Sequence, residues 1–225
     1  MVDLRSGAEM TVSEAARAAA LSPARVRALV NAGRVPSRKV GNQHLVDVNA
    51  LLAMPRRPGR PMSPRMAWAL LLLTDDQRPE WVAPGDVYRV ERHLDRLASD
   101  PAPELLLQAL VRNRATRHAY GAQAPDGLRH DDQLVLSGLS DSRAGLAAAA
   151  DVEAYVQDDD LRGVVRRHLL VAASDARANV WLHSAPFVPP SSLRLQVAAD
   201  LAEHGGPRER QRARDIIRAA VEGRR

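Results

Sequence analysis

The segment "TVSEAARAAALSPARVRALVNAGRVPSRKVGNQHLVDVNALLA", residues 11–53, decides the fold of the first part of the chain. Helix start and stop signals divide this segment into short elements. Ser13 predicts the N-cap of a first helix that runs to Ala20, with small alanines on its inner face. Asp47 predicts the N-cap of another helix at the end of the segment, whose packing face carries Val48, Leu51 and Leu52.

A second helix is predicted between these two. Ser22 provides the N-cap, and Pro23 follows at the first helical position, where a missing amide hydrogen costs nothing. Gly33 predicts the end of the helix, because glycine accepts the left-handed backbone conformation found there. The buried stripe of this helix, with apolar side chains three and four residues apart, is Val26, Leu29 and Val30.

The stretches "RVPSRKV" and "QHLVDV" are predicted to form a hairpin between the second and third helices. They join through Gly41 and Asn42, two residue types that tolerate the positive φ of a tight turn. The resulting order of helix, helix, hairpin and helix is typical of a winged helix-turn-helix.

This segment resembles the excisionase and MerR-type helix-turn-helix domains, through its "SEAA" entry, "LSPARVRALV" second helix, "GRVPSRKVG" wing and "DVNALL" third helix. The resemblance implies that the second helix enters the major groove of DNA and that the wing meets phosphates. Arg25 is the best candidate for reading a base, since a guanidinium can donate two hydrogen bonds to guanine. The DNA contacts predicted in this segment are Ser22, Arg25, Arg27, Asn31, Arg38, Lys39, Asn42 and Gln43.

The distribution of charge favours a polyanionic partner for the first part of the chain. Residues 1–65 contain eleven basic residues and four acidic ones, whereas the other 160 residues contain 21 basic residues and 23 acidic ones. The net charge of +5 therefore originates entirely in the first third, where nucleic acid is the expected ligand.

The stretch "MPRRPGRPMSPR", residues 54–65, marks a boundary between two domains. Its "RRPGRP" core is similar to an AT-hook, in which extended arginines follow the minor groove of A·T-rich DNA. On that interpretation Arg57 and Arg60 contact DNA, and the alternative is a plain basic linker. The predicted domains are 1–54, a winged helix-turn-helix, 55–62, the linker, and 63–225.

The second domain is predicted to be helical with a small sheet, which makes the whole chain mainly α with a small β component, an α+β fold. "SPRMAWALLLL" predicts a buried helix, and "PELLLQALVRNRATRHAYG" a helix that ends near Gly121. The strand-like stretches are "DQLVLSG", "VEAYV" and "ANVWLHS". "DDDLRGVVRRHLLV" predicts an acid-capped helix, and two more helices, separated by Gly205 and Gly206, close the chain.

The order "LVLSG", a small-residue helix "SRAGLAAAA", "VEAYV", "ANVWLH" and "VAADLAEHGGPRERQRARDII" resembles the C-terminal region of AbiEi-like antitoxins of type IV toxin-antitoxin systems. This resemblance implies a transcriptional regulator that represses its own operon and neutralises a cognate toxin. Double-stranded DNA, that toxin and a second copy of the chain in a homodimer are then the expected partners. The alternative is an excisionase-like architectural factor that bends DNA.

A weaker alternative is a nucleotidyltransferase-like enzyme. Gly138 and Ser140 would form its turn, and Asp151 and Glu153, on one side of a strand, would hold magnesium. We expect instead no enzyme, no cofactor and no metal. The chain has no cysteine, and no two of its histidines are three or four residues apart; these are residues 44, 93, 118, 130, 168, 183 and 204.

The compartment expected from the sequence is the cytoplasm. The first residues lack the charged and apolar regions of a secretory signal. The longest compact apolar run, "AWALLLL" at 67–73, is too short to cross a bilayer, so no membrane partner is expected.

Overall fold

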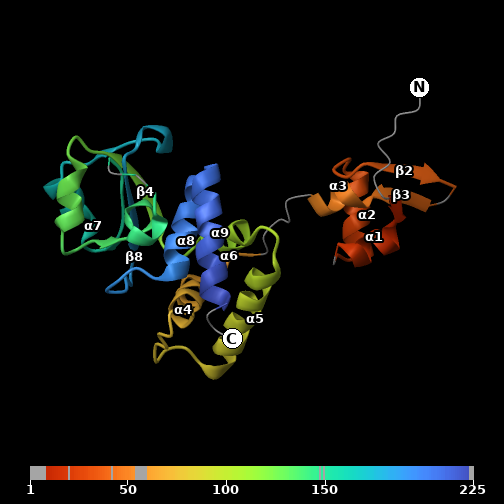
Figure 1. Cartoon of the computed structure of the whole chain (residues 1–225), viewed down its shortest axis with the longest axis horizontal. Helices are drawn as coiled ribbons and strands as arrows, with labels where there is room; N and C mark the ends of the chain where they lie inside the picture. The colour runs from red at the N-terminus through yellow and green to blue at the C-terminus, as the bar shows by residue number, and fades with distance from the viewer. Residues whose placement is uncertain are drawn as a thin grey trace. The chain divides into compact units, whose positions relative to one another are not determined.

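The computed structural model describes residues 9–19, 21–41, 43–53, 60–146, 148 and 150–222. The chain divides into two compact units, Met1–Arg57 and Pro58–Arg225 (Figure 1). The division falls within the stretch that the sequence marks as a linker. Within the described residues, no helix is both long enough and apolar enough to cross a membrane.

The first unit is a small helical domain with a three-stranded antiparallel sheet in the order β1-β3-β2. Its apolar core gathers side chains from the first two helices and from the sheet, including Ala15, Val26 and Val46. Its elements are β1 (Glu9–Thr11), α1 (Val12–Ala18), α2 (Pro23–Asn31), β2 (Ser37–Val40), β3 (Gln43–Asp47) and α3 (Val48–Ala53).

The predicted order of helix, helix, hairpin and helix is confirmed, but the first helix starts earlier than predicted. Its N-cap is Thr11 and not Ser13. The Thr11 hydroxyl accepts a hydrogen bond from the backbone amide of Glu14, whose carboxylate accepts one from the amide of Thr11. This reciprocal capping box needs a glutamate three residues after the cap, which Thr11 has and Ser13 lacks. The helix ends at Ala18, and the predicted end, Ala20, lies outside the described residues.

Two further features of the first unit differ from the prediction. Glu9–Thr11 forms an additional strand, which pairs with β3 on the side opposite to β2. Leu52 was expected to pack inward but is 51% exposed, whereas Val48 and Leu51 are buried. A six-residue helix can bury only one narrow face, and Val48 and Leu51, which are three residues apart, occupy that face.

The second unit has a five-stranded mixed sheet in the order β5-β6-β8-β4-β7, in which only β6 and β8 are parallel. The predominance of helix around this sheet and the first confirms the α+β class expected from the sequence. The helices and strands of the second unit are α4 (Pro64–Thr74), α5 (Pro84–Ser99), α6 (Pro103–Val111), β4 (Thr116–Gly121), β5 (Val135–Leu136), β6 (Val152–Gln157), α7 (Leu161–Arg167), β7 (Val171–Ala172), β8 (Val180–Ala185), α8 (Arg194–His204) and α9 (Pro207–Glu222).

The sheet of the second unit separates two apolar layers. On one side, α7 covers a core made with alternate strand residues such as Val152 and Leu182. On the other side, α8 and α9 pack together with α4, α5 and α6 around a larger core, which Tyr155 joins from the sheet (Figure 1). Because neighbouring residues of a strand face opposite sides, β6 and β8 contribute to both layers.

Several predictions for the second unit need correction. The helix expected to reach Gly121 ends at Val111, and Thr116–Gly121 forms strand β4, which lies between β8 and β7. The stretch "TRHAYG" contains a β-branched and an aromatic residue, and its pairing with β8 overrides the helical pattern that precedes it. The predicted strand "DQLVLSG" shrinks to Val135–Leu136.

The small-residue helix predicted for "SRAGLAAAA" is also absent. Ser142–Ala144 forms a single 3-10 turn, and Gly145 follows at φ +59°, which is the left-handed region where a helix stops. Ala147 and Ala149 lie outside the described residues. Helix α7 has an acidic residue, Asp160, at its N-cap as predicted, but the Asp160 side chain makes no capping hydrogen bond. The separation of α8 from α9 at Gly205 and Gly206 is confirmed.

Candidate nucleic-acid interface and buried polar cluster

Helix α2 presents a well-defined outer face in the first unit. The Ser22 hydroxyl accepts a hydrogen bond of 3.2 Å from the backbone amide of Arg25, so the predicted cap is confirmed. Val26, Leu29 and Val30 are buried, as predicted. These three side chains fix the rotation of the helix and leave its remaining positions turned outward.

The exposed residues of α2 combine two arginines with small side chains. Arg25, Arg27 and Asn31 are exposed, as are Ala24 and Ala28. At 100° per residue, the two alanines and Asn31 lie opposite the buried stripe, and the arginines flank them on either side. Among the described residues, neither arginine side chain makes an ion pair, so both guanidinium groups are free to meet an anion.

The hairpin carries a second group of exposed polar side chains. Lys39 and Gln43 are exposed near the turn, and Gly41 has the positive φ of 58° that the prediction required. Arg38 behaves differently, because its guanidinium donates three hydrogen bonds of 2.6–2.9 Å to the carboxylate of Glu9 on β1. That carboxylate balances the charge of Arg38, which therefore offers less to a phosphate than Lys39 does.

The remaining predicted contacts are placed only in part. Asn42 and Arg57 lie outside the described residues. Arg60 is described and exposed, and it makes no ion pair with the described part of the chain. The interpretation of residues 55–62 as a DNA-contacting arm stays a prediction.

The second unit contains a buried polar cluster that was not predicted from the sequence. Glu153 and Tyr155 on β6, and His183 on β8, point to the layer that contains α8, while their strand neighbours point to α7. Asp200 and His204 are four residues apart on α8, and their side chains point from the helix toward these strand residues. We call the set Glu153, Tyr155, His183, Asp200 and His204, with Ser137, Arg114 and Glu203, the polar cluster.

Glu153 is fully buried at the centre of the cluster. Its Oε1 lies 2.9 Å from Nε2 of His183, and its Oε2 lies 2.9 Å from Nε2 of His204. The backbone amide of Leu139 donates a third hydrogen bond, also of 2.9 Å, to Oε2. A buried carboxylate needs such donors, because leaving its charge unpaired would cost several kcal/mol.

Asp200 is the second fully buried carboxylate of the cluster. Its Oδ1 accepts hydrogen bonds from the Arg114 guanidinium and from the Tyr155 hydroxyl, and its Oδ2 accepts one from the Ser137 hydroxyl. Arg114 is also buried and lies 2.8 Å from the carboxylate of Glu203. The ring of Tyr155 stacks on that of His183 at 4.7 Å, which joins the two halves of the cluster.

The surroundings of these groups shift their pKa values. Burial alone would raise the pKa of Glu153, but the hydrogen bonds from His183 and His204 hold it well below its usual range. Burial alone would lower the pKa of His204, and the hydrogen bond with Glu153 raises it instead. The pKa of Arg114 also rises despite burial, because three acidic groups, Tyr155, Glu203 and Asp200, surround its charge.

Gly138 allows the loop after β5 to wrap around Glu153. It has φ +50°, and a Cβ atom at this position would lie 1.8 Å from Oε2 of Glu153. Only glycine fits so close an approach with a left-handed backbone. The amide of Leu139 and the hydroxyl of Ser140, which accepts a hydrogen bond from the amide of Glu153, are brought into place by this turn.

The carboxylate pair of the nucleotidyltransferase-like alternative is not brought together. Strand β6 begins at Val152, so Asp151 lies before it. The group of side chains with the spacing of metal ligands consists of Glu153, His183 and Asp200, and does not include Asp151. The Gly138–Ser140 turn does lie beside Glu153, but it serves to hold that carboxylate.

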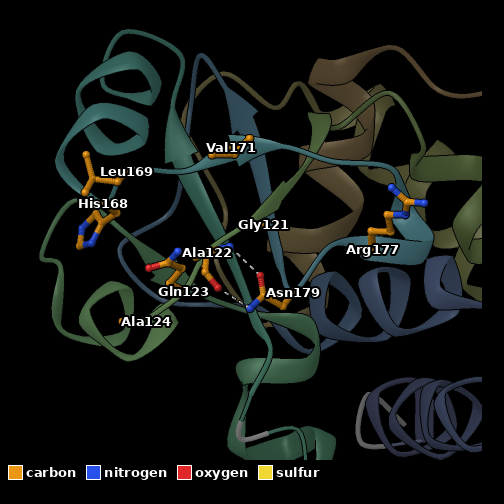
Figure 2. Close-up of a pocket in the computed structure, with 9 residues that line it drawn as sticks. All are labelled: Gly121, Ala122, Gln123, Ala124, His168, Leu169, Val171, Arg177 and Asn179. Carbon is orange, nitrogen blue, oxygen red and sulfur yellow. Dashed lines mark hydrogen bonds between the residues drawn. The ribbon is translucent and has the colours of Figure 1, made fainter.

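A groove of about 740 Å³ lies beside β7, at the end of the sheet away from β5 (Figure 2). The side chains of Leu169 and Val171 are 82% and 69% exposed at this groove. Among the lining residues, Asn179 exchanges two hydrogen bonds with the backbone of Ala122, and Arg177 lies on the side opposite to His168 and Leu169 (Figure 2). Leu169 has φ +52°, which is unusual for a residue other than glycine.

Comparison of the chain with known protein families finds no matching family. Comparisons with curated proteins and with solved structures find no match either. The function therefore has to be inferred from the side chains described above.

Proposed function

We propose that the protein is a sequence-specific, double-stranded DNA-binding transcriptional regulator, and that the first unit is its DNA reader. The observation that supports this proposal is the outer face of α2. There, a capped helix carries two exposed arginines without ion-pair partners in the described chain, and the hairpin that follows α2 in the sequence carries an exposed lysine. Such a helix and hairpin match the dimensions of a major groove and of the adjacent phosphate backbone.

The proposed role of each residue on this surface follows from the geometry of its side chain. Arg25 lies in the first turn of α2, and a guanidinium there can donate two hydrogen bonds to O6 and N7 of guanine. Ala24 and Ala28 project little from the helix, so they allow its axis to approach the base edges closely. Lys39 meets phosphates, which add affinity without sequence preference.

The basic stretch between the units is proposed as an accessory arm. Arg57 and Arg60 flank prolines that favour an extended backbone, which suits insertion along a narrow minor groove. Arg60→Ala should weaken binding to all duplexes alike and reduce the slope of log K against log salt by about 1. Unchanged binding would leave residues 55–62 as a plain linker.

We further propose that the regulator is the autoregulating antitoxin of a type IV toxin-antitoxin system. The support is the resemblance of the second unit to AbiEi-like antitoxins, in the order of its strands and closing helices. The second unit would then neutralise a cognate toxin, and a homodimer would bind repeated half-sites of its own operator. Co-expression with the neighbouring gene tests this role: growth arrest by that gene should be relieved by this protein.

DNA reading is tested by fluorescence anisotropy with the full chain. The probe is a duplex from the region upstream of its own gene, and a duplex of the same composition in scrambled order is the reference. Arg25→Ala should weaken binding to the specific duplex by about 1–3 kcal/mol and reduce the preference over the scrambled one. Arg166→Ala, which removes the same charge from an exposed position of the second unit, is the matched control and should bind normally.

Two results would contradict the proposal. One is the absence of salt-sensitive binding of the full chain to any duplex. The other is equal loss of binding in Arg25→Ala and Arg166→Ala, because it would assign the affinity to net charge and not to α2.

A further inference from the structure

We propose that Glu153, His183 and Asp200 form a binding site for one divalent transition-metal ion of the Zn²⁺ or Mn²⁺ type in the second unit. The ligand atoms of these three residues all lie within 4.8 Å of one another. Nε2 of His183 is 2.9 Å from Oε1 of Glu153 and 4.0 Å from Oδ1 of Asp200. These separations bracket the spacing of about 3.3 Å that bonds of about 2.0–2.1 Å impose around a tetrahedral ion.

Hydrogen bonds orient two of the ligands, Glu153 and Asp200, and the ring of Tyr155 stacks on that of His183 at 4.7 Å. The amide of Leu139 and Nε2 of His204 contact the second oxygen of Glu153. The Ser137 hydroxyl donates to the second oxygen of Asp200. Metal-binding side chains are commonly fixed by outer hydrogen bonds of this kind, which set the direction of the ligand lone pairs.

The charge of the cluster also favours a cation. It contains three carboxylates, those of Glu153, Asp200 and Glu203, and one guanidinium, that of Arg114. With neutral imidazoles, and with Nε of Arg117 3.7 Å from the Glu203 carboxylate, the cluster keeps one uncompensated negative charge, in surroundings where Glu153 and Asp200 are fully buried. Uncompensated negative charge in a buried site costs free energy, and a bound divalent cation would balance that charge.

The donor atoms limit the identity of the ion. An imidazole beside two carboxylates suits Zn²⁺ or Mn²⁺, whereas Mg²⁺ prefers oxygen ligands and retains several waters. The chain has no cysteine, so thiolate sites cannot compete for the ion. A histidine spacing of three or four residues, which is the local signal of a helical metal site, is irrelevant here, because the ligands come from β6, β8 and α8.

The alternative explanation is that the site binds no ion and that protonated histidines of the cluster balance the charge of the carboxylates. The test uses tag-free, full-chain protein that has been treated with chelator and dialysed. ZnCl₂, MnCl₂ and MgCl₂ are titrated separately by calorimetry, and the bound metal is counted by elemental analysis. Thermal unfolding is followed by tryptophan fluorescence, which reports on the second unit because Trp68, Trp81 and Trp181 all lie in it.

The expected result is one equivalent of Zn²⁺ or Mn²⁺ per chain. At a hundredfold excess over the dissociation constant, the melting temperature of the second unit should rise by about 5–10 °C. Glu153→Gln and His183→Gln should abolish stoichiometric binding. His93→Gln, which removes a histidine remote in sequence from the cluster, should bind the ion normally.

Less than a tenth of an equivalent bound, with an unchanged melting temperature in all three salts, would overturn the proposal. So would normal binding by a folded His183→Gln variant. If both cluster variants fail to fold, the unaltered chain is titrated with Co²⁺ and its visible absorption is measured. Visible ligand-field absorption typical of a four-coordinate ion, saturating at one equivalent, would support the site, and a six-coordinate aqueous spectrum would refute it. None of these outcomes depends on DNA binding.

Discussion

Gly138 and Gly145 offer a direct measurement of how much the polar cluster contributes to stability. Both have a left-handed backbone, with φ of +50° and +59°, so replacement by alanine costs each about 1–2 kcal/mol. They differ in what the new methyl group would meet. At Gly145 the nearest atom is Nε of Arg212 at 4.0 Å, whereas at Gly138 the carboxylate of Glu153 lies at 1.8 Å.

Gly138→Ala must therefore displace the Glu153 side chain from its three donors. Each hydrogen bond to a charged group contributes about 1.5–3 kcal/mol net. We expect a total loss of about 5 kcal/mol or more for Gly138→Ala, and about 1–2 kcal/mol for Gly145→Ala. The first value is large compared with the stability of a typical domain, which is about 5–15 kcal/mol.

The assay is urea unfolding of both full-chain variants, followed by tryptophan fluorescence of the second unit. In thermal unfolding, Gly145→Ala should lower the melting temperature by about 2–8 °C, on a scale of about 2–4 °C per kcal/mol. Gly138→Ala should lower it by at least about 10 °C or prevent folding. Equal losses in the two variants would refute the reasoning, because they would show that backbone conformation, and not the contact with Glu153, sets the cost.

Three further predictions concern single side chains. Glu9→Gln should release Arg38 from its ion pair, so that affinity for any duplex increases and the salt slope steepens by about 1; unchanged anisotropy titrations would count against a phosphate-facing wing. Leu169→Asn should raise the free energy of unfolding by about 0.5–1 kcal/mol, because asparagine tolerates positive φ and the leucine side chain is 82% exposed; a loss of stability in denaturant titrations would contradict this. Burial tends to raise the pKa of Asp141, but hydrogen bonds from Arg143 and Ser192 lower it. The Asp141 carboxylate therefore stabilises the fold above its unfolded pKa of about 3.9, and this contribution is lost as pH falls through the lower, folded pKa. The difference in unfolding free energy between the unaltered chain and Asp141→Asn should accordingly shrink as pH falls below about 3.9, and a difference that stays constant down to about pH 2 would exclude this role.

The sequence allowed close prediction of the first unit because its determinants are local. Ser22, Pro23 and Gly33 act through the backbone of their own neighbours, so their roles are readable from a window of a few residues. The incorrect prediction of Ser13 as the N-cap of α1 also arose from local signals. Thr11 and Ser13 are both capping residue types, and the deciding signal was the glutamate three residues after Thr11.

Prediction failed where the partner of a segment is distant in the chain. Strand β4 follows a helical stretch and becomes a strand through pairing with β8, more than 60 residues later. The polar cluster is less predictable still, because Glu153, His183 and Asp200 come from three elements. A usable signal existed, since Glu153 and His183 are ionisable residues within two largely apolar strands that the sequence had already identified. A charged or polar residue in a buried strand needs a partner, which predicts the existence of a cluster but not its members.

The polar cluster has a consequence for the fold that does not depend on a bound ion. Strands β6 and β8 are buried on both faces, and both faces carry apolar side chains, so hydrophobic burial discriminates weakly between one register and its neighbour. A shift by one residue would turn Glu153 or His183 to the layer under α7, among Val152, Leu182 and similar side chains that have no donors to offer. That arrangement would leave a buried charge unpaired at a cost of several kcal/mol. The cluster therefore selects the observed register of β6 against β8, and α8 is held to the sheet at the same point, because Asp200 and His204 complete the contacts that Glu153 and Tyr155 begin.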